Sequence, residues 1–118
     1  MSLYRSNARI ERVDRHWQAT DALICGEVSI GEDCSFWFQT VVRGDVAPIR
    51  IGNRVNIQEH SCLHCDSGKP LEIGDEVTIG LGAVVNWAKV GRGTLVWMKA
   101  FILGECVVGE ECIVAAGA

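Results

Sequence analysis

The stretch that decides the fold is residues 90–118, VGRGTLVWMKAFILGECVVGEECIVAAGA. Branched aliphatic residues recur there every six positions, at Val90, Val96, Ile102, Val108 and Val114. Small residues follow four positions later in each unit, at Thr94, Ala100, Cys106, Cys112 and Ala118. A period of six fits neither the 3.6-residue turn of a helix nor the alternation of a single strand, so each unit is predicted to be a short strand followed by a corner. Stacked units of this kind form a parallel β-helix.

The same ladder extends back along the chain to Ile24, with three irregular steps. Residues 43–49 interrupt it around Pro48, residues 64–72 carry turn-forming side chains, and one step from Val85 to Val90 is only five residues long. If three ladder positions make a coil, the chain has about five coils. The fifteen ladder positions are Ile24, Ile30, Phe36, Val42, Ile51, Ile57, Leu63, Ile73, Ile79, Val85, Val90, Val96, Ile102, Val108 and Val114.

Composition limits the classes of protein to consider. The 118 residues are 48% hydrophobic, with 13 Gly and 2 Pro, which predicts one compact domain. A formal net charge of −4 argues against a surface for nucleic acid or for an anionic membrane. No apolar run reaches the roughly 18 residues of a membrane span, and residues 1–5 do not begin a signal peptide, so we expect a cytoplasmic protein. Its six cysteines are then expected to be free thiols.

The repeat also divides the chain. Residues 1–20 contain no ladder position, and arginines are spaced there among Ile10, Val13 and Trp17. We expect an extended N-terminal lead-in over residues 1–20 that lies over the first coil, followed by the β-helix domain over residues 21–118.

Residues 21–118 resemble the gamma-class carbonic anhydrase branch of the hexapeptide-repeat proteins. The resemblance implies a left-handed β-helix that assembles as a homotrimer, with zinc or a similar divalent ion in each of three sites between subunits. The segments that carry it are Ile30-Gly31, Phe36-Trp37, Val41-Val42-Arg43-Gly44-Asp45-Val46, Ile49-Arg50-Ile51-Gly52, Asn56-Ile57-Gln58, Leu63-His64 and Ile73-Gly74-Asp75-Glu76-Val77-Thr78-Ile79-Gly80.

The ligand positions that the resemblance implies are only partly retained. His64 stands at the first, but Leu81 and Asn86 replace histidine at the second and third. Leucine has no lone pair to donate, and an amide carbonyl is a poor zinc ligand, so a degenerate metal site is predicted. Gln58, which by the resemblance would orient metal-bound solvent, would be vestigial.

Compared with the family, two positions near this site carry larger side chains and two others are unchanged. Trp87 and Trp97 replace small residues of the family, and they would either fill a cavity there or line an apolar pocket. Arg43 and Asp45 match residues that join neighbouring subunits in the family, which favours assembly as a trimer.

A rebuilt metal site is the alternative. Alternation along a strand would turn Cys62 and His64 to the same outer face, where the two side chains and a group from a neighbouring subunit could chelate an ion. The pair Cys62 and Cys65 is by itself a weak zinc signal.

Two function classes therefore remain open, and enzymatic activity is left uncertain. The first is a trimer without zinc and without carbonic anhydrase activity that acts as a binding or assembly module. The second is a metal-dependent hydratase with a new ligand set around His64. The family usually continues into a C-terminal helix, which this sequence lacks, and we expect the uncovered last coil to let trimers associate end to end as hexamers.

Overall fold

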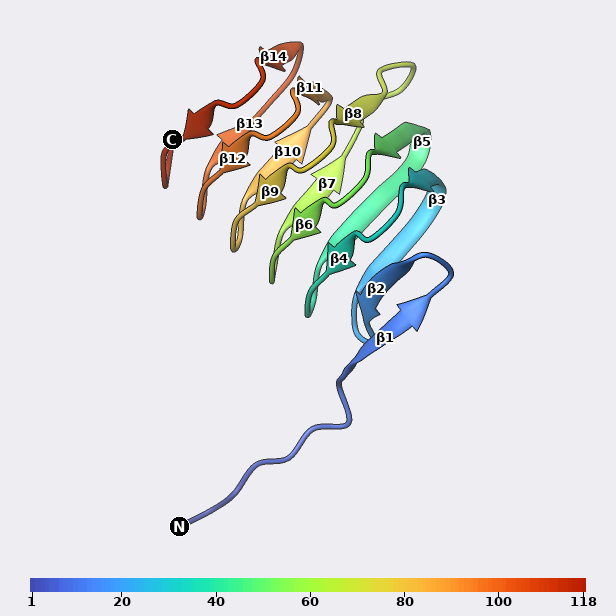
Figure 1. Ribbon diagram of the computed structural model, residues 1–118, viewed down its shortest axis with the longest axis vertical. Helices are drawn as coiled ribbons and strands as arrows, with labels where there is room; N and C mark the ends of the chain where they lie inside the picture. Colours follow the sequence, from blue (N-terminus) through green and yellow to red (C-terminus); the bar gives the residue numbers. More distant parts are fainter.

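The computed structural model describes residues 1–118 as a solenoid of fifteen short strands without a helix (Figure 1). It accordingly has no helical segment of the length and hydropathy that spanning a membrane requires. In chain order the strands are β1 (Ile10–Val13), β2 (His16–Ala19), β3 (Leu23–Ile30), β4 (Ser35–Phe36), β5 (Val41–Ile51), β6 (Asn56–Ile57), β7 (Cys62–His64), β8 (Leu71–Ile73), β9 (Thr78–Ile79), β10 (Val84–Asn86), β11 (Ala88–Val90), β12 (Leu95–Val96), β13 (Phe101–Ile102), β14 (Cys106–Val108) and β15 (Ile113–Val114).

Strand pairing defines three faces of a triangular coil. The first face stacks β2, β4, β6, β9, β12 and β15. The second stacks residues 23–26 of β3, residues 41–44 of β5, β7, β10 and β13, and the third stacks residues 28–30, residues 49–51, β8, β11 and β14. All pairs within these faces are parallel, so the predicted β-helix of about five coils is confirmed.

The aliphatic ladder fills the inside of the coils. Ladder positions on neighbouring coils are register partners, as in the row Ile24, Val42, Leu63, Val85 and Ile102 of the second face. Central members are fully buried, and those of the first and last coils pack against the same core cluster. Burying each such side chain contributes about 1.5–3 kcal/mol, which is the main stabilisation of a fold with no other core.

The β-helix begins earlier than residue 21. Within the expected lead-in over residues 1–20, β1 and β2 form an antiparallel hairpin, and β2 pairs in parallel with β4. His16 packs edge-on against Phe36 at 5.3 Å and contacts Gln18 at 3.0 Å, so polar side chains close this end of the core. Residues 1–9 precede the first strand and project from the coils (Figure 1).

The three irregular steps of the ladder have different structural causes. Residues 43–49 do not form a loop, because β5 continues unbroken around the corner from the second to the third face. Of residues 64–72, only residues 65–70 lie between β7 and β8, in a turn closed by a bridge between Asp66 and Lys69. The five-residue step is a corner at Trp87, whose φ of 44° turns β10 directly into β11.

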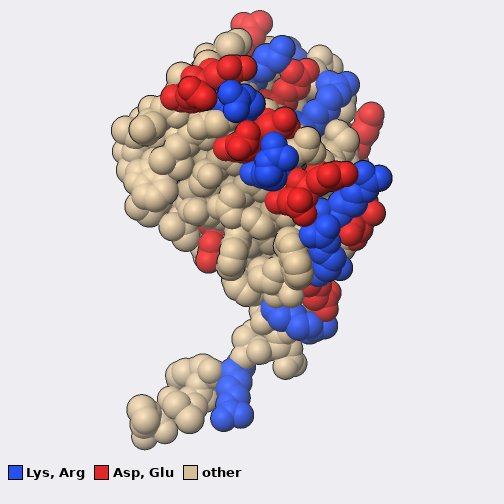
Figure 2. All heavy atoms as spheres, in the orientation of Figure 1, with Lys and Arg blue, Asp and Glu red and all other residues tan.

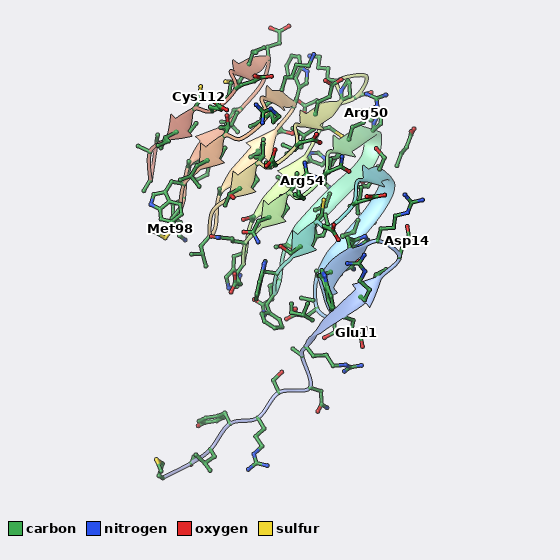
Figure 3. All side chains as sticks on the ribbon, in the orientation of Figure 1. Glu11, Asp14, Arg50, Arg54, Met98 and Cys112 are labelled. Atoms are coloured by element: carbon green, nitrogen blue, oxygen red, sulfur yellow. The ribbon has the colours of Figure 1, made fainter.

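Charged side chains gather on one side of the molecule, and much of the other side is uncharged (Figure 2). Near the corner between the third and first faces, Arg92 lies 3.4 Å from Glu76 and 3.5 Å from Glu111. The corner between the first and second faces instead carries Leu81 and Met98, and Figure 3 shows Met98 at the left edge of the coils, on the opposite side from Arg50.

Candidate functional site

The second face brings Arg43, His64 and Asn86 into one row across three neighbouring strands. Arg43 of β5 is the register partner of His64 of β7, which in turn is the partner of Asn86 of β10. Because the ladder residues before them point inward, these three side chains point outward. The structure thus places two of the three ligand positions, His64 and Asn86, side by side.

Arg43 contacts one of the two ring nitrogens through which His64 could bind a metal. Its Nη2 lies 3.0 Å from His64 Nε2. A guanidinium group can only donate, so Nε2 is the acceptor and its lone pair is used. Asp45 completes the cluster, with its Oδ1 3.7 Å from Arg43 Nε and 3.6 Å from His64 Nε2.

Asn86 is poorly satisfied in its surroundings. Its Nδ2 approaches Asp66 Oδ1 only to 3.5 Å, and its buried Oδ1 has no hydrogen-bond donor. A buried acceptor without a donor loses about 1–3 kcal/mol of solvation that nothing restores. The polar row therefore ends at a pair of side chains, Asn86 and Asp66, that lacks a cation or a donor.

Leu81, the remaining ligand position, lies elsewhere. It is 40% exposed at the corner between β9 and β10, at the end of the second face opposite His64 and Asn86. The chain brings no three His, Cys, Asp or Glu side chains together in a metal-binding group. Together with the use of His64 Nε2 by Arg43, this donor set does not fit a zinc ion held by one chain.

Gln58 and the two tryptophans are at three separate places. Gln58 follows β6 and lines a shallow hollow with Trp37, Glu59 and Leu81. Trp97 stands two coils further along the same face and is 36% exposed. The indole of Trp87 lies at the corner between the second and third faces, where the Lys69 ammonium is 3.9 Å from its ring centre.

The loop of residues 65–70 is attached to the coils by this contact between Lys69 and Trp87. The ring of Trp87 also approaches Gly104 to within about 3.5 Å of where a Cβ would lie, so it fits between the loop and the last corner. A cation over a tryptophan face stabilises by about 0.5–1 kcal/mol at an exposed site. Sequence reasoning did not identify Lys69 or Asp66, because the loop that positions them has no repeat.

Cys62 and His64 do lie on the same outer face of β7, as the alternation predicts, with Leu63 between them fully buried. Cys65 points inward, and its Sγ lies 3.0 Å from the Ala47 carbonyl oxygen. Desolvation by burial raises the pKa of Cys65, which keeps this thiol protonated. The two cysteines of the C-x-x-C pair therefore point to opposite sides of the sheet.

Cys62 belongs to an apolar row parallel to the polar one. Its members are successive register partners along the second face: Leu23, Val41, Cys62, Val84 and Phe101. Leu23 is 54% exposed and Phe101 56% exposed, so the row is accessible at both ends. The second face thus presents an apolar row beside a polar row, which is a composition typical of protein interfaces.

Comparison with known proteins identifies the family. No protein-family model matches the chain. It is 49% identical over 87 residues to a carbonic anhydrase of Geobacillus kaustophilus, in an alignment that covers 74% of this chain and 48% of that protein. It is 42% identical over 106 residues to gamma carbonic anhydrase 1, mitochondrial, of Arabidopsis thaliana, which covers 85% of this chain and 38% of that protein.

Solved structures agree with the sequence relatives. A hexapeptide transferase family protein from Anaplasma phagocytophilum superposes with a TM-score of 0.75 at 32% identity, over 85% of this chain and 62% of that one. The chain spans about half the length, or less, of the curated relatives it matches. Its repeat, its coils and these relatives together show that the chain belongs to the gamma-carbonic-anhydrase-like hexapeptide-repeat family.

Proposed function

We propose that this protein is a gamma-carbonic-anhydrase-like trimer that has lost zinc binding and carbonic anhydrase activity and acts as a binding or assembly module. The observation that carries the proposal is the state of the three ligand positions. His64 Nε2 accepts a hydrogen bond from Arg43, Asn86 offers only an amide, and Leu81 has no atom that can bind a metal.

Loss of activity follows from the chemistry that the ion supplies in carbonic anhydrases. A bound zinc lowers the pKa of its water from 15.7 to about 7, so that hydroxide is available at neutral pH. A catalytic zinc normally needs three protein ligands and one open position. A single imidazole that already accepts a hydrogen bond from Arg43 does not meet that requirement.

Two surfaces of the coils support assembly as a ring. The second face carries the apolar row, and the corner between the first and second faces carries the exposed Leu81 together with Met98. Because the two surfaces are different, contact between one and the other is head to tail and closes into a ring when the rotation is right. In such a trimer Leu81 of each copy would approach the row of Arg43, His64 and Asn86 on the next.

Metal analysis of the purified assembly tests the proposal. We expect sedimentation to give a trimer, elemental analysis to give far less than one zinc per chain after dialysis against zinc, and stopped-flow measurement to detect no carbon dioxide hydration above buffer. Stoichiometric zinc together with hydration activity would overturn the loss of function. A monomer at all concentrations would overturn the assembly.

The placement of Cys62 and His64 on one outer face favours a second candidate, a metal-dependent hydratase with a rebuilt ligand set. A third ligand would have to come from a neighbouring copy, since one chain offers no group of three. The variants Cys62→Ser and His64→Ala decide between the candidates. If both abolish metal binding and hydration in a trimer that otherwise remains intact, the hydratase is correct.

A further inference from the structure

Lys99 is the one cation of the coils without a partner. Seven of the eight arginines and Lys89 lie within 4.0 Å of a carboxylate, and Lys69 lies over the ring of Trp87. The remaining arginine, Arg5, precedes the first strand. An exposed lysine gains little from an ion pair in water, so a free Lys99 is unremarkable alone, but its position is informative.

Lys99 stands at the corner that carries Leu81. Its backbone N–H donates to the Leu81 carbonyl oxygen at 2.9 Å. Its side chain lies across Gly82, where a Cβ would meet Lys99 Cδ at 3.1 Å and Nζ at 3.5 Å. The absence of a Cβ at Gly82 therefore lets the lysine stem lie along the backbone, with its ammonium group beside Gly82, the residue after Leu81.

A matching acceptor lies at the other end of the second face. Asp66 is half-buried and forms no ion pair within the chain, and its carboxylate accepts a hydrogen bond only from the Asn86 amide, at 3.5 Å. Asn86 Oδ1 has no donor. A cation placed here would relieve two unfavourable features at once. It would pair with the half-buried Asp66 carboxylate, and, once the Asn86 amide rotates, it would donate a hydrogen bond to the unsatisfied Asn86 Oδ1.

Lys99 and Asp66 cannot meet within one chain. Lys99 precedes β13 at one corner of the second face, and Asp66 follows β7 at the opposite corner. In a head-to-tail ring the corner that carries Lys99 in one copy faces the second face of the next copy. Lys99 of one copy can therefore meet Asp66 of the next.

Resting on the proposed trimer, we propose that Lys99 of each copy pairs with Asp66 and Asn86 of the next, so that an ammonium group takes the place of the divalent ion between subunits. The site is then incomplete in a single chain. The ligand of the site is a second copy of this chain, and its charge replaces the charge that the metal would bring to the interface.

A double-mutant cycle on assembly tests this pairing. Lys99→Met and Asp66→Asn keep side-chain size while removing one charge each. Each single variant should raise the dissociation constant of the trimer about tenfold or more, since hydrogen bonds to charged groups are of that magnitude. The dissociation constant of the double variant should be no higher than that of the single variant that assembles less tightly, because both changes remove the same contact.

The pair Lys89 and Glu72 gives a matched control. Its atoms lie 3.3 Å apart on the third face, away from both interface surfaces. Lys89→Met and Glu72→Gln should leave the dissociation constant of the trimer unchanged. Exchanging the charges, with Lys99→Asp and Asp66→Lys in one chain, should recover at least part of the lost assembly.

Sedimentation velocity over a dilution series measures all of these variants. If the wild type is a trimer and the Lys99 and Asp66 effects are absent or simply additive, the pairing is wrong while the proposed function stands. If the wild type is a monomer throughout, both fail. Circular dichroism of each variant separates loss of assembly from loss of folding.

Discussion

Arg43 donates a hydrogen bond to His64 across neighbouring strands of the second face, with 3.0 Å between Nη2 and Nε2. The contact follows from parallel register, which puts the two residues opposite each other on β5 and β7. It places a permanent positive charge at one of the two nitrogens through which a histidine can bind zinc. Asp45 lies beside the same nitrogen, with its Oδ1 3.6 Å from His64 Nε2.

Restoring histidine at the two altered positions should restore metal uptake. Because His64 and position 86 are register partners and Leu81 lies at the corner that a neighbouring copy would present, Leu81→His with Asn86→His completes three imidazoles only in an assembled ring. We expect about one zinc per chain in the double variant by elemental analysis. The single variant Asn86→His is the control and should retain much less. A trimeric double variant that remains free of zinc would contradict the proposed geometry.

The buried thiols should make the fold sensitive to alkaline pH. Desolvation raises the pKa of Cys34 and of Cys65 above the ordinary value of 9.0. The folded state therefore holds protons that the unfolded state releases, so the free energy of unfolding is unaffected below about pH 9 and falls as pH rises through the folded pKa values. Urea unfolding under reducing conditions, at about pH 8 and about pH 10, measures the difference.

Matched cysteine variants isolate this effect from other groups that titrate at high pH. In Cys34→Ala with Cys65→Ala the loss of stability between the two pH values should be smaller than in the wild type. Cys62→Ser, on the outer face, should leave the loss unchanged. Equal losses in all three proteins would show that the buried thiols do not contribute.

The close approach of successive coils should make Gly91→Ala destabilising. A Cβ at Gly91 would lie 2.5 Å from the carbonyl carbon of Gly109 in the next coil, and backbone cannot move aside locally. Overpacking of this kind costs about 1–3 kcal/mol. Gly109→Ala is the matched control, because its Cβ would meet only Cys112 Sγ, at 3.5 Å. Chemical denaturation should separate the two variants, and equal midpoints would argue against this stacking distance.

The ladder itself should tolerate truncation least at its centre. Leu63 is fully buried between Val42 and Val85, so Leu63→Ala removes core volume that neighbouring coils cannot refill, at a cost of about 2–5 kcal/mol. Leu103→Ala, at a residue 59% exposed, should change stability by no more than about 0.5 kcal/mol. If Leu63→Ala and Leu103→Ala had the same denaturant midpoint, the ladder would not be the main core.

The repeating part of the fold was readable from residue order alone. All fifteen ladder positions, such as Ile24, Leu63 and Val108, pack into the core or against it, because a six-residue period leaves a stacked coil as the only arrangement that buries every member. The outward direction of Cys62 and His64 followed from the same alternation. Local pattern was insufficient at the start of the chain, where His16 and Gln18 occupy core positions without being aliphatic.

The candidate site depended on contacts between residues far apart in the chain. Nothing in the order of residues places Arg43 on the lone pair of His64, turns Cys65 away from Cys62, or leaves Asn86 Oδ1 without a donor. Those facts arise from how neighbouring coils stack and from the loop that carries Asp66 to Asn86. Periodicity decides which way a side chain points, whereas its partners come from other coils, some twenty residues away, and are known only once the coils are stacked.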